Sequence, residues 1–285
     1  MDDFLAALLG VPLVFHQEQA QLERDSQRCA EVLSRGVPLC DFHSKTGPSA
    51  FLSRTAAVQS GALTIVNGIH TPICGASSND QGLATFYLPF HGEARFGVEG
   101  RWLCSRAGET AVLMPGQAHR GDTDFYGGVV FSLPPQRLAR AAAALLGDPA
   151  SEERLRPAFD HPHEFNVTDR RQRNLLALMR RSLALIDLVP GRPAILPATL
   201  PLDDLLSRLV VLLVHPWLLE VAPRQALEPG RRPQQRETGL EATHQNLHGD
   251  GTEQQAHQAA DHLLLQFSHQ PMQRHRRRPR GRNRA

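Results

Sequence analysis

Short apolar runs alternate with turn residues over the stretch from residue 51 to residue 133. Seven or eight strands are predicted here, in the runs 51–58, 62–69, 83–90, 94–98, 102–105, 111–114 and 125–133. The separators include Ser60-Gly61, Glu99-Gly100 and Pro115-Gly116, and the middle pair fits a tight hairpin. Strands at intervals of about ten residues, with no helical pattern between them, indicate an antiparallel sandwich or barrel.

Helical periodicity flanks this stretch on both sides. Residues 17–33 contain no Gly or Pro and predict one amphipathic helix. Three more helices are predicted after Leu133: one from Pro134 to Gly147, one capped near Thr168-Asp169, and one from Pro201 to Pro216. The apolar face of the second of these is formed by Leu175, Met179, Leu183 and Ile186.

The last predicted helix has a leucine stripe that either packs against the chain's own sheet or forms a dimer interface. Its members are Leu202, Leu205, Leu206, Leu209, Leu212 and Leu213. Packing within the monomer is the commoner use of such a face. A homodimer, or a mixed dimer with a related protein, is the alternative.

Composition changes sharply after Val221. The last 64 residues hold only 15 apolar residues, and no Val, Ile, Trp or Tyr occurs among them. They carry 11 Arg against 6 acidic residues, with a cluster in residues 274–284. Such a composition cannot bury enough surface to offset chain entropy, so a disordered basic tail is predicted, of the kind that a shifted reading frame yields. Any DNA contact of this tail is expected to be weak and nonspecific.

The sequence therefore predicts an α+β protein with four parts. These are an amino-terminal segment with one amphipathic helix (1–48), a β-barrel (49–135), a helical extension (136–221) and the tail (222–285). Met1-Asp2-Asp3 lacks the positive segment of a secretory signal, and no apolar run approaches the roughly 20 residues that span a bilayer. The four cysteines form no CxxC pair. We expect a cytoplasmic protein with reduced thiols and no membrane partner.

Residues 83–121 and 125–147 together resemble a known family. The stretches LATFYLPFHGEARFGVEGRWLCSRAGETAVLMPGQAHRG and FYGGVVFSLPPQRLARAAAALLG are similar to the amino-terminal sensor domain of AraC-type transcription regulators. The resemblance covers roughly residues 20–220 and rests on the order of the patterns. It implies a cupin-like barrel that binds a small-molecule effector or mediates pairing. The helix-turn-helix units that follow in this family have no counterpart after Val221.

The residues give no positive support for an enzyme. The segment from Gly108 to His119 resembles half of a cupin metal site, but His70 and His91 stand alone and no His-x-His is present. No metal and no cofactor are therefore expected, and His119 is interpreted as a turn or rim residue. The segment His161-Pro162-His163-Glu164 is interpreted as a surface loop, and neither a GxSxG elbow nor a phosphate loop occurs. No catalytic residue is predicted.

A ligand pocket inside the barrel would be lined by inward side chains of the central strands. The candidates are Phe86, Leu88, Phe96, Trp102, Leu113 and Phe131, with Arg95 and His119 as polar anchors. The alternative is that these side chains simply fill the barrel interior. The predicted function is ligand sensing and oligomerisation in an AraC-type regulator without a working DNA-binding half. A cupin-fold enzyme, or a stand-alone small-molecule-binding protein, is the alternative.

Overall fold

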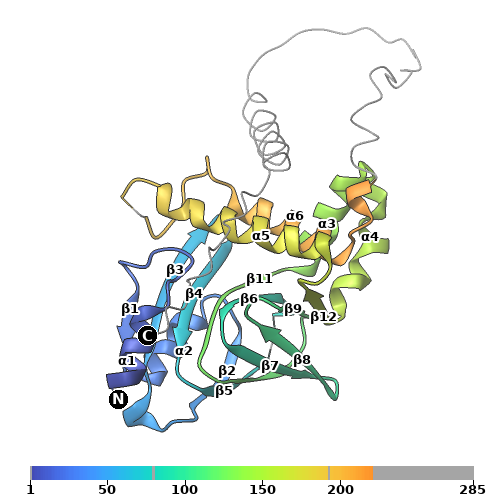
Figure 1. Cartoon of the computed structure of the whole chain (residues 1–285). Helices are drawn as coiled ribbons and strands as arrows, with labels where there is room; N and C mark the ends of the chain where they lie inside the picture. The colour runs from blue at the N-terminus through green and yellow to red at the C-terminus, as the bar shows by residue number, and fades with distance from the viewer. Residues whose placement is uncertain (1, 79–80, 192, 221–285) are drawn as a thin grey trace, which may run out of the picture. The chain divides into compact units, whose positions relative to one another are not determined.

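The computed structural model describes residues 2–78, 81–191 and 193–220. Twelve strands in this part of the chain form one antiparallel sheet (Figure 1). Their bounds are β1 Gln21–Glu23, β2 Leu39–Ser44, β3 Ser53–Ser60, β4 Leu63–His70, β5 Ile73–Ser77, β6 Ala84–His91, β7 Glu93–Val98, β8 Arg101–Arg106, β9 Thr110–Met114, β10 His119–Thr123, β11 Tyr126–Leu133 and β12 His163–Asn166. The predicted tail, 222–285, and its arginine cluster lie outside the described residues.

The sheet is curled into a half-barrel. Its strand order is β1-β3-β4-β11-β6-β9-β8-β7-β10-β5-β2, and β12 pairs with β9 beside β8. The strands β4, β11 and β6 form one wall, and β7, β10 and β5 curl round to face them (Figure 1). Together with the helices, this confirms the predicted α+β class with a curled antiparallel sheet, which forms a half-barrel.

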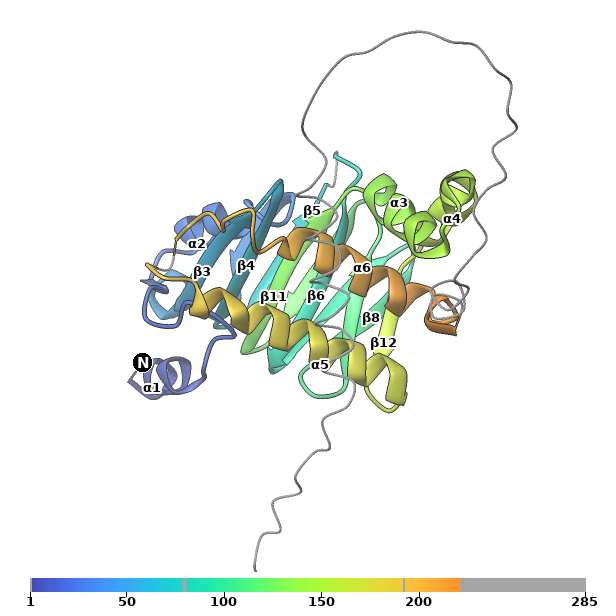
Figure 2. The same cartoon turned by 90° about the horizontal axis from the view of Figure 1, so that it is seen from above.

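Six α-helices accompany the sheet in the residues that the structure describes. They are α1 Asp2–Gly10, α2 Ser26–Leu33, α3 Pro135–Leu146, α4 Glu152–Leu155, α5 Arg170–Ala184 and α6 Leu202–Val214. The Asp169 carboxylate caps α5 by accepting a hydrogen bond from the backbone N–H of Gln172 at 2.9 Å. Helices α5 and α6 lie across the outer face of β4, β11 and β6 (Figure 2). The three helices predicted after residue 133 are therefore confirmed.

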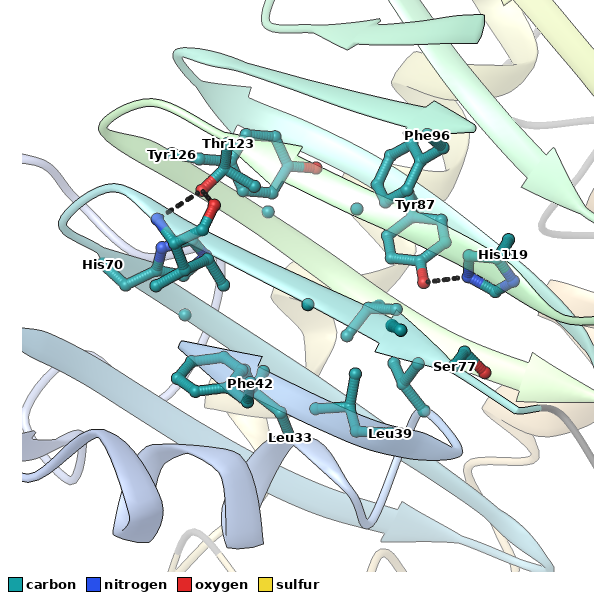
Figure 3. Close-up of a pocket in the computed structure, with 18 of the residues that line it drawn as sticks. Leu33, Leu39, Phe42, His70, Ser77, Tyr87, Phe96, His119, Thr123 and Tyr126 are labelled. Atoms are coloured by element: carbon teal, nitrogen blue, oxygen red, sulfur yellow. Dashed lines mark hydrogen bonds between the residues drawn. The ribbon is translucent and has the colours of Figure 1, made fainter. Parts of the chain in front are cut away.

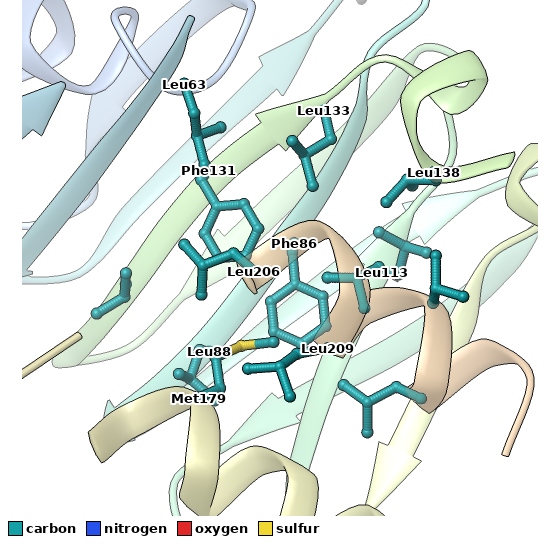
Figure 4. Packing of buried hydrophobic residues seen from close by; sticks show 14 of the residues in the cluster. Leu63, Phe86, Leu88, Leu113, Phe131, Leu133, Leu138, Met179, Leu206 and Leu209 are labelled. Carbon is teal, nitrogen blue, oxygen red and sulfur yellow. The ribbon is translucent and has the colours of Figure 1, made fainter. Parts of the chain in front are cut away.

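The main hydrophobic core lies between this outer face and the helices. Leu206 and Leu209 of α6 and Met179 of α5 pack against Phe86 and Phe131 of the sheet (Figure 4). Five of the six stripe leucines are buried and the sixth, Leu205, is partly buried: Leu202, Leu205, Leu206, Leu209, Leu212 and Leu213. The stripe is thus buried within the chain, in one core with residues of the sheet and of the neighbouring helices α3 and α5.

Several elements were not predicted, and each has a physical reason. The segment 17–33 forms β1 followed by α2 rather than one helix, because Gln21–Glu23 pair with the edge of β3. Strands β1 and β2 both precede residue 49, so the predicted domain boundary cuts through the sheet. The loop interpretation of His163-Glu164 is wrong, since both residues lie in β12 and its Phe165 enters the core.

Glu99-Gly100 forms the predicted hairpin turn between β7 and β8. Val98 pairs with Arg101, which leaves a two-residue loop. Both loop residues have positive φ, 49° at Glu99 and 74° at Gly100. Positive φ at both positions matches the right-handed twist of the flanking strands. The turn brings β8 directly beside β7 and so continues the curl of the sheet.

Candidate ligand pocket

A cavity of about 90 Å³ lies inside the half-barrel, between its two walls (Figure 3). Its lining combines residues from β4, β6 and β11, from the facing strands β5, β7 and β10, and from the segment that runs from α2 to β2. The side chains drawn around it include Leu33, Leu39, Phe42, His70, Ser77, Tyr87, Phe96, His119, Thr123 and Tyr126. Segments far apart in the sequence therefore converge on one small space.

Strand alternation decides which side chains reach this space. Tyr87 of β6 lines the cavity, while its neighbours Phe86 and Leu88 belong to the core beneath the helices, and Tyr126 of β11 also lines the cavity. On β10, Gly121 lines the cavity, and a methyl group at its Cα would meet the Phe96 ring at 3.5 Å. The missing side chain of Gly121 thus leaves part of the space open.

Tyr87 and His119 form a polar pair at one end of the cavity (Figure 3). The Nδ1 atom of His119 lies 3.1 Å from the Gln117 carbonyl, which can only accept a hydrogen bond. In the neutral ring Nε2 is then an acceptor, and the Tyr87 hydroxyl at 3.2 Å donates to it. Burial lowers the pKa of His119 and raises that of Tyr87, so both side chains stay neutral. The Tyr87 oxygen keeps the capacity to accept a hydrogen bond.

His70 provides a second polar group, at the end of β4. Its Nδ1 lies 2.9 Å from the Thr71 carbonyl, which fixes Nδ1 as the donor of the neutral ring. The ring centroid lies 5.8 Å from that of Tyr126. Burial lowers the pKa of His70 to about 4, against a smaller opposite effect of the Thr71 carbonyl. His70 therefore presents Nε2 as an acceptor at the cavity wall, while its hydrogen bond to the backbone is made through Nδ1.

Two of the eight predicted pocket residues, Phe96 and His119, line the cavity. His119 begins strand β10 and is buried, rather than being a turn or rim residue. The structure places four others in the core beneath the helices, on the opposite face of the sheet: Phe86, Leu88, Leu113 and Phe131. It places the remaining two on the outer surface. Arg95 is ion-paired with Glu93 at 2.8 Å, and the Trp102 ring is 64% exposed and covers Gly97.

Sequence reasoning missed His70, Tyr87 and Tyr126 as lining residues. The sequence suggested His70 only as a metal ligand, and the pocket was assigned to Phe86 and Leu88, the apolar residues on either side of Tyr87. A signal was available, because polar aromatic residues within otherwise apolar strands need a hydrogen-bond partner when buried. Tyr87 finds His119, and the Tyr126 hydroxyl lies 3.4 Å from that of Ser105.

Among the described residues, no group of three or more His, Cys, Asp or Glu side chains is arranged to hold a metal ion. In the same part of the chain, no helix has both the length and the apolar character that crossing a bilayer requires.

The cysteines described here, Cys29, Cys40, Cys74 and Cys104, are unbonded thiols. Burial raises the pKa of Cys29 to about 11.

Comparison with known proteins gives a resemblance among solved structures. No family model matches the chain, and no curated protein matches it. Among solved structures, the chain is similar to the one titled "Crystal structure of the AraC-like transcriptional activator CuxR". The two are 15% identical, with a TM-score of 0.49 over 69% of this chain and 70% of that one.

Proposed function

We propose that this chain is the ligand-sensing module of an AraC-type transcription regulator, with the effector bound in the half-barrel cavity. The observation that carries the proposal is the cavity itself, which combines apolar walls with the neutral polar groups of His70, Tyr87 and His119. Apolar cavities with a few convergent polar groups are typical small-molecule sites. The assignment to this regulator class comes from the sequence resemblance.

The position of the cavity suggests how an occupant could be sensed. Leu33, Leu39 and Phe42 come from the segment around α2 and the edge strand β2, while the opposite wall belongs to the central strands. A ligand in contact with both parts would hold the α2–β2 segment against the barrel. Binding of this kind stabilises the folded chain in proportion to the logarithm of ligand concentration.

A thermal-shift screen of the full-length protein tests the proposal. The panel should contain neutral aromatics, carboxylates, amines and sugars. The matched variants are Gly121→Ala, whose methyl group enters the cavity in ordinary contact with Phe96, and Gly10→Ala, whose methyl group meets nothing within 4 Å. We expect at least one class to raise the melting temperature of the wild type and of Gly10→Ala, and to do so less in Gly121→Ala. Equal shifts in all three proteins, or no shift with any class, would contradict a ligand in this cavity.

Pairing of the module, with itself or with a related regulator, is part of the proposal. It requires a surface other than the leucine stripe of α6, which is buried in the monomer. Sedimentation velocity with and without a stabilising compound measures it. A monomer at all concentrations would remove pairing from the proposal.

The proposed role is binding without catalysis. The competing role, a cupin-fold enzyme, predicts stoichiometric iron, zinc or manganese in the purified protein, because such enzymes hold a metal through several convergent N and O donors. Metal analysis by mass spectrometry discriminates between the two roles. Stoichiometric metal would contradict the sensor proposal.

A further inference from the structure

The cavity wall contains no charged side chain. None of its lining residues, all in the described part of the chain, is Lys, Arg, Asp or Glu. Asp122 lies between two lining residues of β10, but its carboxylate accepts a hydrogen bond from the Lys45 ammonium at 2.9 Å and is half exposed. An ion entering the cavity would lose its hydration without meeting a counter-charge, which costs several kcal/mol. The wall therefore favours an uncharged occupant.

The polar groups of the wall offer acceptors to an occupant. His70 uses its Nδ1–H on the Thr71 carbonyl, and Nε2 remains as an acceptor. Tyr87 uses its only proton on His119, so its oxygen also remains as an acceptor. The Ser77 hydroxyl donates to the Pro38 carbonyl at 2.7 Å. A ligand that satisfies His70 Nε2 and the Tyr87 oxygen must bring its own hydrogen-bond donor.

Size sets the third restriction. The volume of about 90 Å³ lies well below the roughly 300–1,000 Å³ of drug-sized pockets. It is closer to the roughly 150 Å³ of an engineered cavity that takes up benzene. The aromatic rings of Phe42, Phe96 and Tyr126 supply flat apolar surfaces around it. The occupant is therefore about one ring in size.

We propose that the cavity selects a small uncharged ring compound that carries a hydrogen-bond donor, of the phenol type, and that His70 Nε2 accepts the hydrogen bond from it. This inference rests on the proposed function, since it names the ligand class of the same cavity. His70 is 6% exposed and belongs to the wall, so a donor that reaches Nε2 from the cavity competes little with water. In this arrangement His70 determines specificity rather than fold.

Four probes that share one ring test the charge and donor requirements. They are phenol, toluene, benzoate and benzylammonium, and their affinities for the full-length protein are measured by calorimetric titration at pH 7.5. Toluene has nearly the shape of phenol but no donor. We expect phenol to bind about 10-fold more tightly than toluene, because toluene leaves the buried acceptor unsatisfied. Benzoate or benzylammonium binding as tightly as phenol, or toluene equal to phenol, would overturn the proposal.

The His70→Phe variant removes the acceptor and keeps a ring of similar size. It is expected to lower the affinity for phenol about 10-fold, to the level of toluene, and to leave toluene unchanged. The matched control is His91→Phe. His91 also ends a strand and lies edge-on to an aromatic ring, Phe125 at 5.0 Å, but it does not line the cavity. The control should bind both probes as the wild type does, and an equal loss in both variants would contradict the role of His70.

A wild-type measurement keeps the proposal testable if His70→Phe does not fold. The imidazole nitrogens of His70 are followed by ¹⁵N NMR during titration. Phenol should move the Nε2 resonance upfield, as expected for a nitrogen that begins to accept a hydrogen bond, and toluene should leave it nearly unchanged. The same response to both probes would contradict the proposed hydrogen bond.

The outcomes separate this inference from the proposed function. If none of the four probes binds, but another class from the thermal-shift panel stabilises the wild type more than Gly121→Ala, the ligand class is wrong and the sensor function stands. If neither the probes nor the panel stabilise the protein, both proposals fail.

Discussion

Lowering the pH should destabilise the folded chain through His70. Burial lowers the pKa of His70 to about 4 in the folded state, whereas an unfolded chain leaves it near the ordinary 6.5. The unfolded state therefore binds more protons between these two values, and the stabilising contribution present above pH 6.5 is lost as the pH falls toward 4. Between pH 7.5 and pH 5 the difference amounts to about 2 kcal/mol of unfolding free energy.

Urea denaturation at pH 7.5 and pH 5, followed by tryptophan fluorescence, measures this effect. Other histidines whose pKa is lowered by desolvation, among them His119, His163 and His215, contribute to the total loss in the wild type. Comparison with His70→Phe isolates one residue, because its phenyl ring does not titrate. The wild type and the His91→Phe control should each lose about 2 kcal/mol more than His70→Phe over this pH range. Equal losses in all three proteins would refute the assignment of a buried neutral His70.

Three further predictions concern the scaffold, and urea denaturation checks each. Gly92→Ala should lower the free energy of unfolding by at least about 3 kcal/mol, because the new methyl group would lie 1.9 Å from the Phe125 carbonyl oxygen. Gly82 has a similar φ but open space around it, so Gly82→Ala should lower the free energy of unfolding by about 1 kcal/mol. Similar losses in the two variants would contradict the packing at Gly92. Leu209→Ala should lower the free energy of unfolding by about 2–5 kcal/mol, because it leaves a cavity beneath α6. Leu188 is exposed, so Leu188→Ala should lower it by at most about 0.5 kcal/mol. A small loss in Leu209→Ala would contradict the packing of α6 on the sheet. Arg137→Ala should lower the free energy of unfolding by about 1 kcal/mol, because it removes the ion pairs with Asp203 and Asp204 at the start of α6, both at 2.8 Å. A loss that does not change in 1 M salt would contradict ion pairing.

The sequence was sufficient for the elements with a clear period and clear ends. Helix α5 has an aspartate cap at Asp169 and a regular apolar face, and both are present in the structure. The hairpin at Glu99-Gly100 was readable from its two turn residues. The strand β10, HRGDT, was missed because its composition is polar, and only its pairing with β5 and β7 makes it a strand.

The pocket was only partly predictable, because both faces of the central strands are buried. On β6, Phe86 and Leu88 face the helix-side core and Tyr87 faces the cavity, so alternation separates two buried faces but does not say which of them lines the pocket. A shift of one residue exchanges the two faces, and the polar hydroxyl of Tyr87 is the local signal that separates them. The helices of the extension decide it, since α5 and α6 cover the face that carries Phe86.

Methyl NMR of the full-length protein during titration with phenol tests most directly the claim that the ligand site lies inside the half-barrel. The account predicts shifts at the cavity methyl groups of Leu39, Ile73 and Val130, with little change at Leu113 and Leu209 in the core beneath the helices. Shifts confined to that helix-side core, or spread over the outer surface, would contradict it.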